Sequence, residues 1–253
     1  CYPDESDSQH PKAWVVKEPL GKILIVDNTI DRENIILDFY LRCFRDSLDI
    51  KDYSIWKIDE TFNSLPYTNA DIAATLNYFP QIFWYNYLGQ SNIEKVAPIF
   101  KTYLESGGKL ILNITGEPLD CLSSMTAELF DTSKVFNSGG RILSGIIIEN
   151  LNQKFPLLSI EQIIGIRCYE LQVNTEDDII YQMAENSTSW QGQPVVGLQH
   201  YDPGQLTVFT IPLHKCNGNN NLDSLFSVLF SPVNSIGNSN TPQKPNKVYL
   251  SAN

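Results

Sequence analysis

The sequence predicts an α/β fold with a doubly wound, mainly parallel sheet and antiparallel additions toward the C-terminus. Two observations support this prediction. In the first half of the chain, short apolar blocks alternate with segments that have the three- and four-residue spacing of amphipathic helices. The last of these blocks, residues 110–112, follows Gly107 and Gly108 almost directly and is apolar at every position. A strand that is apolar on both faces is typical of a parallel sheet covered by helices.

The first half of the chain is expected to supply the parallel strands, at residues 22–27, 53–58, 81–87 and 110–112. Helices are expected at residues 32–47 and 68–79, and a third helix ends near Leu104. Thr29 or Asp31 is the expected N-cap of the first helix. Ser91 and Glu94 have the spacing of a capping box ahead of the third. Strands and helices in this alternation favour right-handed crossovers and a flavodoxin-like arrangement.

The second half of the chain has a different pattern. Helices are expected at residues 118–130 and 222–230, the second with Asn220 or Asn221 as its N-cap. Residues 163–173 and 178–184 alternate like antiparallel strands. Residues 194–199 and 205–211 flank the turn sequence Asp202-Pro203-Gly204, which predicts a β-hairpin.

The chain is expected to form one domain with two extensions. Residues 1–20 hold three prolines and few periodic apolar residues, which predicts a tether. Residues 21–231 are expected to form the α/β domain. Residues 232–253 are rich in Asn, Ser and Pro, which predicts a C-terminal tail.

Composition excludes some classes of function. The formal net charge of −11 argues against a nucleic-acid partner, which needs clustered Lys and Arg. No GxGxxG motif or P-loop is present, so we expect no cofactor. The five cysteines form no CxxC pair, so we expect no metal site. Cys43 and Cys168 fall in periodic segments and are expected to be buried. The sequence also allows one disulfide between cysteines of the chain.

The first residues resemble the mature start of a bacterial lipoprotein. The sequence begins CYPDESDSQHP, with a cysteine followed closely by the acidic residues Asp4, Glu5 and Asp7. In Bacteroidetes lipoproteins, a similar acidic stretch is a surface-export signal. The resemblance implies that Cys1 carries lipid, with an outer-membrane location on the periplasmic side or at the cell surface, and with lipid as the only link to the membrane. The alternative is a chain boundary that happens to fall at a cysteine.

Residues 20–231 resemble the class I glutamine amidotransferase-like fold, and most closely the non-catalytic versions in secreted bacterial proteins. The resemblance rests on KILIVD, on a strand ending at Asp59, on QIFWYNY, on YLESGGKLILNITG and on GQLTVFTIPLHK. Catalytic members of the family place a cysteine after the fourth strand, with a histidine and an acid downstream. Here that turn is Asn113-Ile114-Thr115-Gly116, without cysteine, and the histidine motif is absent. The usual reaction therefore lacks its residues.

Candidate site residues follow from where the predicted strands end. Ligands of doubly wound sheets meet the carboxyl ends of strands, and the polar residues expected there are Asp27, Asn28, Asp59, Glu60, Asn86, Tyr87, Thr115 and Glu117. Such a cluster suits a cation or a polyol, and the alternative is ordinary helix capping. Trp190, in a polar loop segment, is a further candidate for contact with a sugar ring.

The sequence favours a non-enzymatic binding or scaffolding role in the cell envelope, with a glycan or an envelope protein as partner. The rival is a hydrolase or amidase with a rearranged site near the end of the fourth strand. That enzyme would use Thr115, or a cysteine, together with His200 or His214. A purely structural domain is a third possibility.

Overall fold

The computed structural model describes residues 21–29, 33–47, 53–58, 69–87, 93–116, 124–125, 128–129, 137–138, 142–166, 168–171, 179–185, 192–201 and 204–231. The expected tether, the expected tail and Cys1 lie outside these residues, so lipidation of Cys1 stays a prediction. Most of the helix expected at residues 118–130 lies outside them as well. No helix in the described ranges has the length and apolar character needed to cross a membrane.

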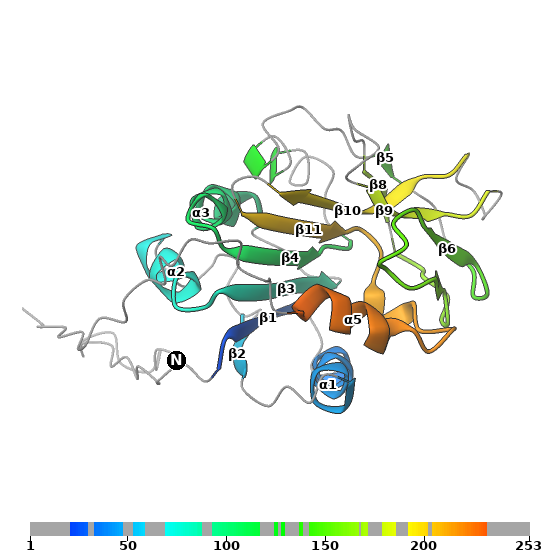
Figure 1. The fold of residues 1–253 in the computed structure, drawn as a ribbon, viewed down its shortest axis with the longest axis horizontal. Helices are drawn as coiled ribbons and strands as arrows, with labels where there is room; N and C mark the ends of the chain where they lie inside the picture. Colours follow the sequence, from blue (N-terminus) through cyan, green and yellow to red (C-terminus); the bar gives the residue numbers. More distant parts are fainter. Residues whose placement is uncertain are drawn as a thin grey trace, which may run out of the picture.

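A nine-stranded sheet, in the order β2-β1-β3-β4-β11-β10-β9-β6-β7, forms the centre of the fold (Figure 1). Its strands are β1 (Ile23–Thr29), β2 (Tyr53–Lys57), β3 (Gln81–Tyr87), β4 (Lys109–Asn113), β6 (Ile147–Asn150), β7 (Leu158–Ser159), β9 (Ile179–Met183), β10 (Val195–Tyr201) and β11 (Gln205–Phe209). Two further short strands, β5 (Asn137–Ser138) and β8 (Tyr169–Glu170), pair with each other in a separate sheet.

The nine-stranded sheet is mixed rather than mainly parallel. Strands β2, β1, β3, β4 and β11 run parallel to their neighbours. From β11 onward, β10, β9, β6 and β7 join in antiparallel pairs. The C-terminal additions therefore extend the same sheet and make up almost half of it. The hairpin expected around Asp202-Pro203-Gly204 is confirmed as β10 and β11.

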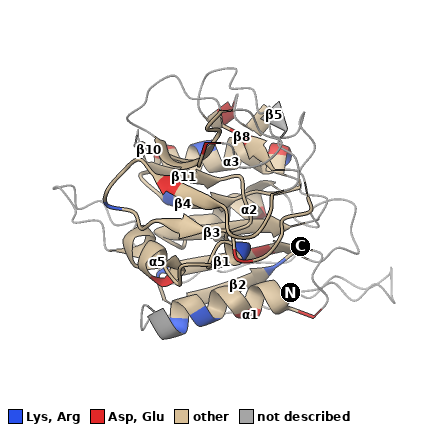
Figure 2. Ribbon diagram, turned by 90° about the vertical axis from the view of Figure 1, so that its right-hand side faces the viewer, with Lys and Arg blue, Asp and Glu red and all other residues tan. Residues whose placement is uncertain are grey.

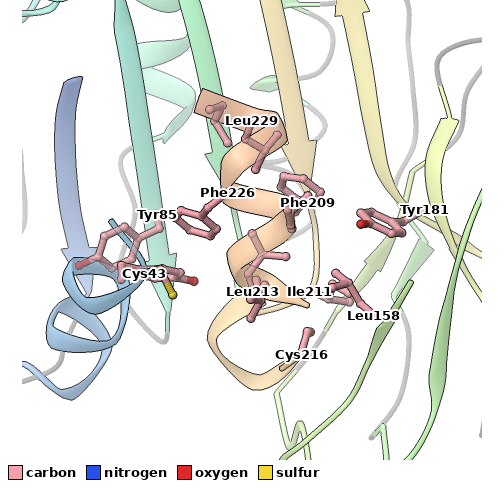
Figure 3. Packing of buried hydrophobic residues seen from close by; sticks show 14 of the residues in the cluster. Cys43, Tyr85, Leu158, Tyr181, Phe209, Ile211, Leu213, Cys216, Phe226 and Leu229 are labelled. Atoms are coloured by element: carbon pink, nitrogen blue, oxygen red, sulfur yellow. The ribbon is translucent and has the colours of Figure 1, made fainter. Parts of the chain in front are cut away.

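Helices cover both faces of the parallel half (Figure 1). On one face lie α1 (Ile35–Arg42), its π-helical continuation η1 (Cys43–Ser47) and α5 (Leu222–Phe230). On the other lie α2 (Asn69–Leu76) and α3 (Ile93–Glu105). Successive strand residues point to opposite faces of the sheet, so each group of helices packs on alternate strand residues. Ile25 packs on the face covered by α1 and α5, and Val26 packs on the face covered by α2 and α3. Figure 3 shows Phe226 and Leu229 of α5 among the strand residues Tyr85 and Phe209.

The helix ends differ in detail from the expected caps. Asn34, with φ 58°, is the N-cap of α1, whereas Thr29 belongs to β1 and Asp31 lies outside the described residues. Neither Asn34 nor Asn221 caps its helix through its side chain. Gly107 has φ +88°, the left-handed conformation that commonly follows the end of a helix, here α3.

Cys43 and Cys168 are buried, as expected, and Cys216 is buried as well. None of these three takes part in a disulfide, whereas Cys121 lies outside the described ranges. Burial raises the pKa of the Cys168 thiol to about 12 and raises that of Cys216 well above its ordinary value. These thiols stay protonated at neutral pH and are therefore poor nucleophiles.

Candidate functional site

The carboxyl ends of β1, β3 and β4 bring together a cluster of buried polar side chains. The strands are in register, so Asp27 lies beside Tyr85 and Tyr85 lies beside Asn113. The polar members of this cluster that are at most 7% exposed are Asp27, Asn28, Thr29, Asn86, Asn113 and Thr115. Buried polar atoms destabilise a fold unless they have hydrogen-bond partners, so their partners decide what the cluster can do.

Thr115 occupies the turn after β4 where a nucleophile would stand, and both of its polar groups are already in use. Its hydroxyl donates to the backbone carbonyl of Asn86 at 2.9 Å. Its backbone N–H donates to Oδ1 of Asn86 at 2.8 Å. Thr115 is 0% exposed, and the positive φ of this turn belongs to Gly116. A hydroxyl that is buried and bonded in this way is not presented to a substrate.

The side chain of Asn113 makes hydrogen bonds to three separate segments at this edge of the sheet. Its Oδ1 accepts from the Tyr40 hydroxyl at 2.9 Å and from the Leu213 backbone N–H at 3.2 Å. Its Nδ2 donates to the backbone carbonyl of Ile211 at 2.6 Å and more weakly to that of Phe209 at 3.4 Å. These bonds tie α1 to β4 and hold the short 3-10 helix η3 (Leu213–Lys215) against the strand end.

Asp27 is a fully buried carboxylic acid at the end of β1. The Thr29 hydroxyl donates to its Oδ1 at 2.7 Å, whereas no described residue makes a hydrogen bond of ordinary geometry to Oδ2. Burial raises the pKa of Asp27 above its ordinary value, because the charged form loses its hydration. The Thr29 hydrogen bond, the charge of Lys57 and the Tyr85 hydroxyl each lower the pKa and offset part of this effect.

Asn28 and Asn86 lie next to each other on the opposite face of the sheet from Asp27. They are register partners, and Asn86 is the residue that holds Thr115. The Nδ2 of Asn28 is buried and finds no hydrogen-bond partner in the described part of the chain. Asn28 and Asp27 therefore point away from each other and do not form a joint pair of ligands.

His214 is the histidine that the structure places at this edge. Its ring centroid lies 4.8 Å from that of Tyr87, edge to face, and 6.2 Å from that of Tyr40. The Nζ of Lys215 lies 5.1 Å from the centroid of Tyr87, within the range of a cation–π contact. Tyr87, His214 and Lys215 are all partly exposed, and we call these three residues the aromatic shelf.

His200 lies at the other end of the sheet. It faces Leu206 of β11, which in turn faces Leu110 of β4. Leu110 precedes Thr115 by five residues, which corresponds to roughly 15 Å along a strand. The structure therefore brings His214 to the same edge as Thr115 and does not bring His200 there.

The remaining candidates named from the sequence lie outside the described residues, namely Asp59, Glu60, Glu117 and Trp190. In the described ranges, no three His, Cys, Asp or Glu side chains come together in a way that could hold a metal ion.

The sequence analysis missed Asn113 and Tyr40 as members of this cluster. Their bond joins residues 73 positions apart, and Tyr40 has the spacing of an ordinary core residue of a helix. One signal pointed to Asn113, namely a polar residue that ends an otherwise apolar strand, LILN. The partner of such a residue depends on the tertiary fold and is not visible in the local pattern.

Comparison with known proteins finds likenesses of fold. No protein-family model and no curated protein sequence matches the chain. A crystal structure described as that of a ThuA-like protein from Bacteroides uniformis ATCC 8492 matches with a TM-score of 0.52 and 13% identity, over 88% of this chain and 96% of that one.

A second crystal structure, described as that of a GMP synthase component from Thermoplasma acidophilum, has a TM-score of 0.44 and 12% identity, over 84% of this chain and 96% of that one. The chain has the fold of the ThuA-like protein. Identity of 13% shows the fold alone and says nothing of a shared reaction.

Proposed function

We propose that this chain is a non-catalytic binding or scaffolding domain with a flavodoxin-like, amidotransferase-like architecture. The observation that carries the proposal is the bonding of Thr115 to Asn86 through both its hydroxyl and its backbone N–H. Acyl transfer by this architecture needs an exposed nucleophile on the turn after the fourth strand. In this chain the hydroxyl on that turn stabilises the protein instead, because it satisfies the buried Asn86 carbonyl.

The aromatic shelf is the part of the carboxyl edge that suits a ligand. Aromatic rings that are partly exposed can stack on the apolar face of a sugar. Lys215 and His214 add polar groups beside the Tyr87 ring. We therefore propose that the ligand is a glycan or another polyhydroxylated molecule, and that it binds on these three residues.

A hydrolase or amidase with a rearranged site is the second candidate. The observations that favour it are the raised pKa of Asp27 and the presence of His214 at the same edge. A carboxylic acid with a raised pKa is the kind of group that serves as a general acid. Asp27 is fully buried, however, and a general acid has to reach the reacting atom.

The test is a binding screen with a panel of neutral mono- and disaccharides, followed by isothermal titration calorimetry. We expect saturable binding that Tyr87→Ala abolishes and Tyr87→Phe keeps, because the ring and not the hydroxyl makes the contact. The matched control is Tyr78→Ala, which removes another exposed tyrosine at the end of α2 and is expected to bind like wild type.

The same samples are assayed for reaction products, namely reducing ends from glycosides and ammonia from glutamine. We expect none. Product formation that disappears in Thr115→Val or in His214→Ala, with folding retained, would establish the enzyme and overturn the proposal. Binding to none of the saccharides would remove the glycan part of the proposal and leave a structural role.

A further inference from the structure

Two aromatic rings near the carboxyl edge of the sheet each have a positively charged group over them. The Nζ of Lys215 lies 5.1 Å from the ring centroid of Tyr87, and the Cζ of Arg42 lies 5.3 Å from that of Phe39. Arg42 is exposed, and the other three side chains are partly exposed. Tyr87 and Lys215 belong to the aromatic shelf, whereas Phe39 and Arg42 belong to α1.

His214 connects the two pairs. Its ring centroid lies 4.8 Å from that of Tyr87 and 6.4 Å from that of Phe39, with the rings edge to face in both contacts. Both distances are within the range of aromatic contacts. Three rings therefore form a row with a positive charge at each end, and we call these five residues the extended shelf: Lys215, Tyr87, His214, Phe39 and Arg42.

Arg42 has no carboxylate partner in the described part of the chain. Asp38 precedes it on α1 by four residues, the spacing at which ion pairs form along a helix. The Arg42 guanidinium lies over the Phe39 ring instead, and no described carboxylate forms an ion pair with it. Its N–H groups remain available to an anion from outside the chain.

The Lys215 ammonium lies at the other end of the extended shelf and is held in place there. Its Nζ donates to the backbone carbonyl of Ile163 at 3.3 Å, and the Lys215 carbonyl accepts from the Glu161 backbone N–H at 2.8 Å. An ammonium group has three N–H donors, so the bond to Ile163 leaves others for a ligand. A group that is already held loses less entropy when a ligand binds.

We propose that the extended shelf binds a glycan that contains negatively charged sugars of the uronic-acid type. This inference rests on the proposed function, which places a glycan on the aromatic shelf. A sugar ring beside Tyr87 brings its carboxylate to Lys215, and a second acidic unit lies on Phe39 with its carboxylate at Arg42. Hydrogen bonds between charged groups are stronger than those between neutral groups, so the two cations favour an acidic ligand over a neutral one.

The overall charge of the protein does not oppose this choice of ligand. Part of α1 carries Lys or Arg (Figure 2), although the formal net charge of the chain is −11. Salt screens charges that are more than about 10 Å apart at 0.1 M ionic strength. The cations of the extended shelf therefore act on a bound sugar more strongly than distant carboxylates do.

The first test compares galactose with galacturonic acid by isothermal titration calorimetry at pH 7. The two sugars differ in that a carboxylate replaces the CH2OH group, so the ratio of their affinities measures the effect of the charge. We expect galacturonic acid to bind about tenfold tighter, and Lys215→Gln to reduce this ratio to about one. Lys154→Gln removes the charge of an exposed lysine elsewhere and is expected to keep the wild-type ratio.

The second test compares galacturonic acid with digalacturonic acid. We expect the disaccharide to bind about tenfold tighter than the monosaccharide, because its second carboxylate reaches Arg42. Arg42→Gln should remove this gain, and Lys154→Gln should keep it.

The outcomes separate this inference from the proposed function. Galactose that binds as tightly as galacturonic acid would overturn the inference and leave a glycan-binding domain. Failure of every sugar to bind would overturn both. A preference for galacturonic acid that Lys215→Gln does not change would place the acidic sugar elsewhere and overturn the inference. A disaccharide gain that persists in Arg42→Gln would overturn the part assigned to α1.

Discussion

The two ends of the same five parallel strands use polar residues in different ways. At the carboxyl edge, Asn113, Asn86 and Thr115 bond to one another's segments and to the backbone. At the amino edge, burial alone lowers the pKa of Lys109, and the Oε1 of Gln81 is buried without a hydrogen-bond partner among the described residues. The Oδ2 of Asp27 and the Nδ2 of Asn28, at the carboxyl edge, are unbonded in the same way. A cluster of polar residues is therefore not in itself a site. Bonded polar groups stabilise the fold and unbonded ones destabilise it, so substitutions at the two kinds of group should change the free energy of unfolding in opposite directions.

The largest effect is expected from Asn113→Ala, which tests whether the carboxyl-edge cluster is structural. The substitution removes the partner of the Tyr40 hydroxyl, the Leu213 N–H and the Ile211 carbonyl, all of which are buried. We expect the free energy of unfolding in urea to fall by about 3 to 5 kcal/mol. Asn77→Ala, at an exposed position beyond α2, is the control and is expected to change it by less than about 0.5 kcal/mol.

A loss of less than about 1 kcal/mol in Asn113→Ala would contradict the structural role of this edge. The comparison would then fail, because Asn113 would be a fully bonded polar group that the fold does not need.

Lys109→Met is expected to change the free energy of unfolding by an intermediate amount and in the opposite direction, toward greater stability. The folded-state pKa of about 8 lies below the ordinary 10.5, so the charged lysine destabilises the folded state at neutral pH. Methionine should raise the free energy of unfolding by about 2 kcal/mol at pH 7, since one pKa unit corresponds to about 1.4 kcal/mol and solvent at the edge weakens the effect.

The pH dependence of stability tests the direction of this effect. Wild-type stability should rise as the pH increases from about 8 to 10.5, because the unfolded chain holds the proton longer, and the advantage of methionine should shrink over the same window. Chemical denaturation at several pH values measures this. A Lys109→Met protein that is less stable than wild type at pH 7 would mean that the ammonium group has a partner in the chain.

Asp27→Asn is expected to change the free energy of unfolding least. The Thr29 hydrogen bond and the charge of Lys57 already offset part of the cost of burying the Asp27 carboxylate. Burial raises the pKa of Asp27 above 3.8, so wild-type stability should fall as the pH rises from 3.8 through the folded-state pKa. The asparagine variant should lack this loss and be slightly more stable than wild type at pH 7. Identical pH profiles for the two proteins would show that Asp27 is not buried as described.

Much of the fold was predictable from local pattern. The bounds of β3 and α5 agree with the predicted segments 81–87 and 222–230, and the turn sequence correctly indicated the hairpin. The end of β1 was placed too early, at Asp27, because its last residues are polar. Strand β1 continues to Thr29 because Thr29 pairs with Tyr87 of β3, and a pairing of that kind depends on register.

The candidate site was predictable in its location but not in its chemistry. The parallel topology implied that Asp27, Asn86 and Thr115 would share an edge. Whether their polar atoms were occupied depended on contacts between distant segments, such as Tyr40 with Asn113. The antiparallel pairing of β10 also carried His200 to the far end of the sheet, which the sequence spacing alone did not reveal.

The most direct test of this account is chemical-shift mapping of a labelled sample with a saccharide from the panel that binds. We expect the saccharide to perturb Tyr87, His214 and Lys215 and to leave Thr115 unchanged, because the Thr115 hydroxyl and N–H are both bonded to Asn86. A saccharide that perturbs Thr115 and is turned over would contradict the account.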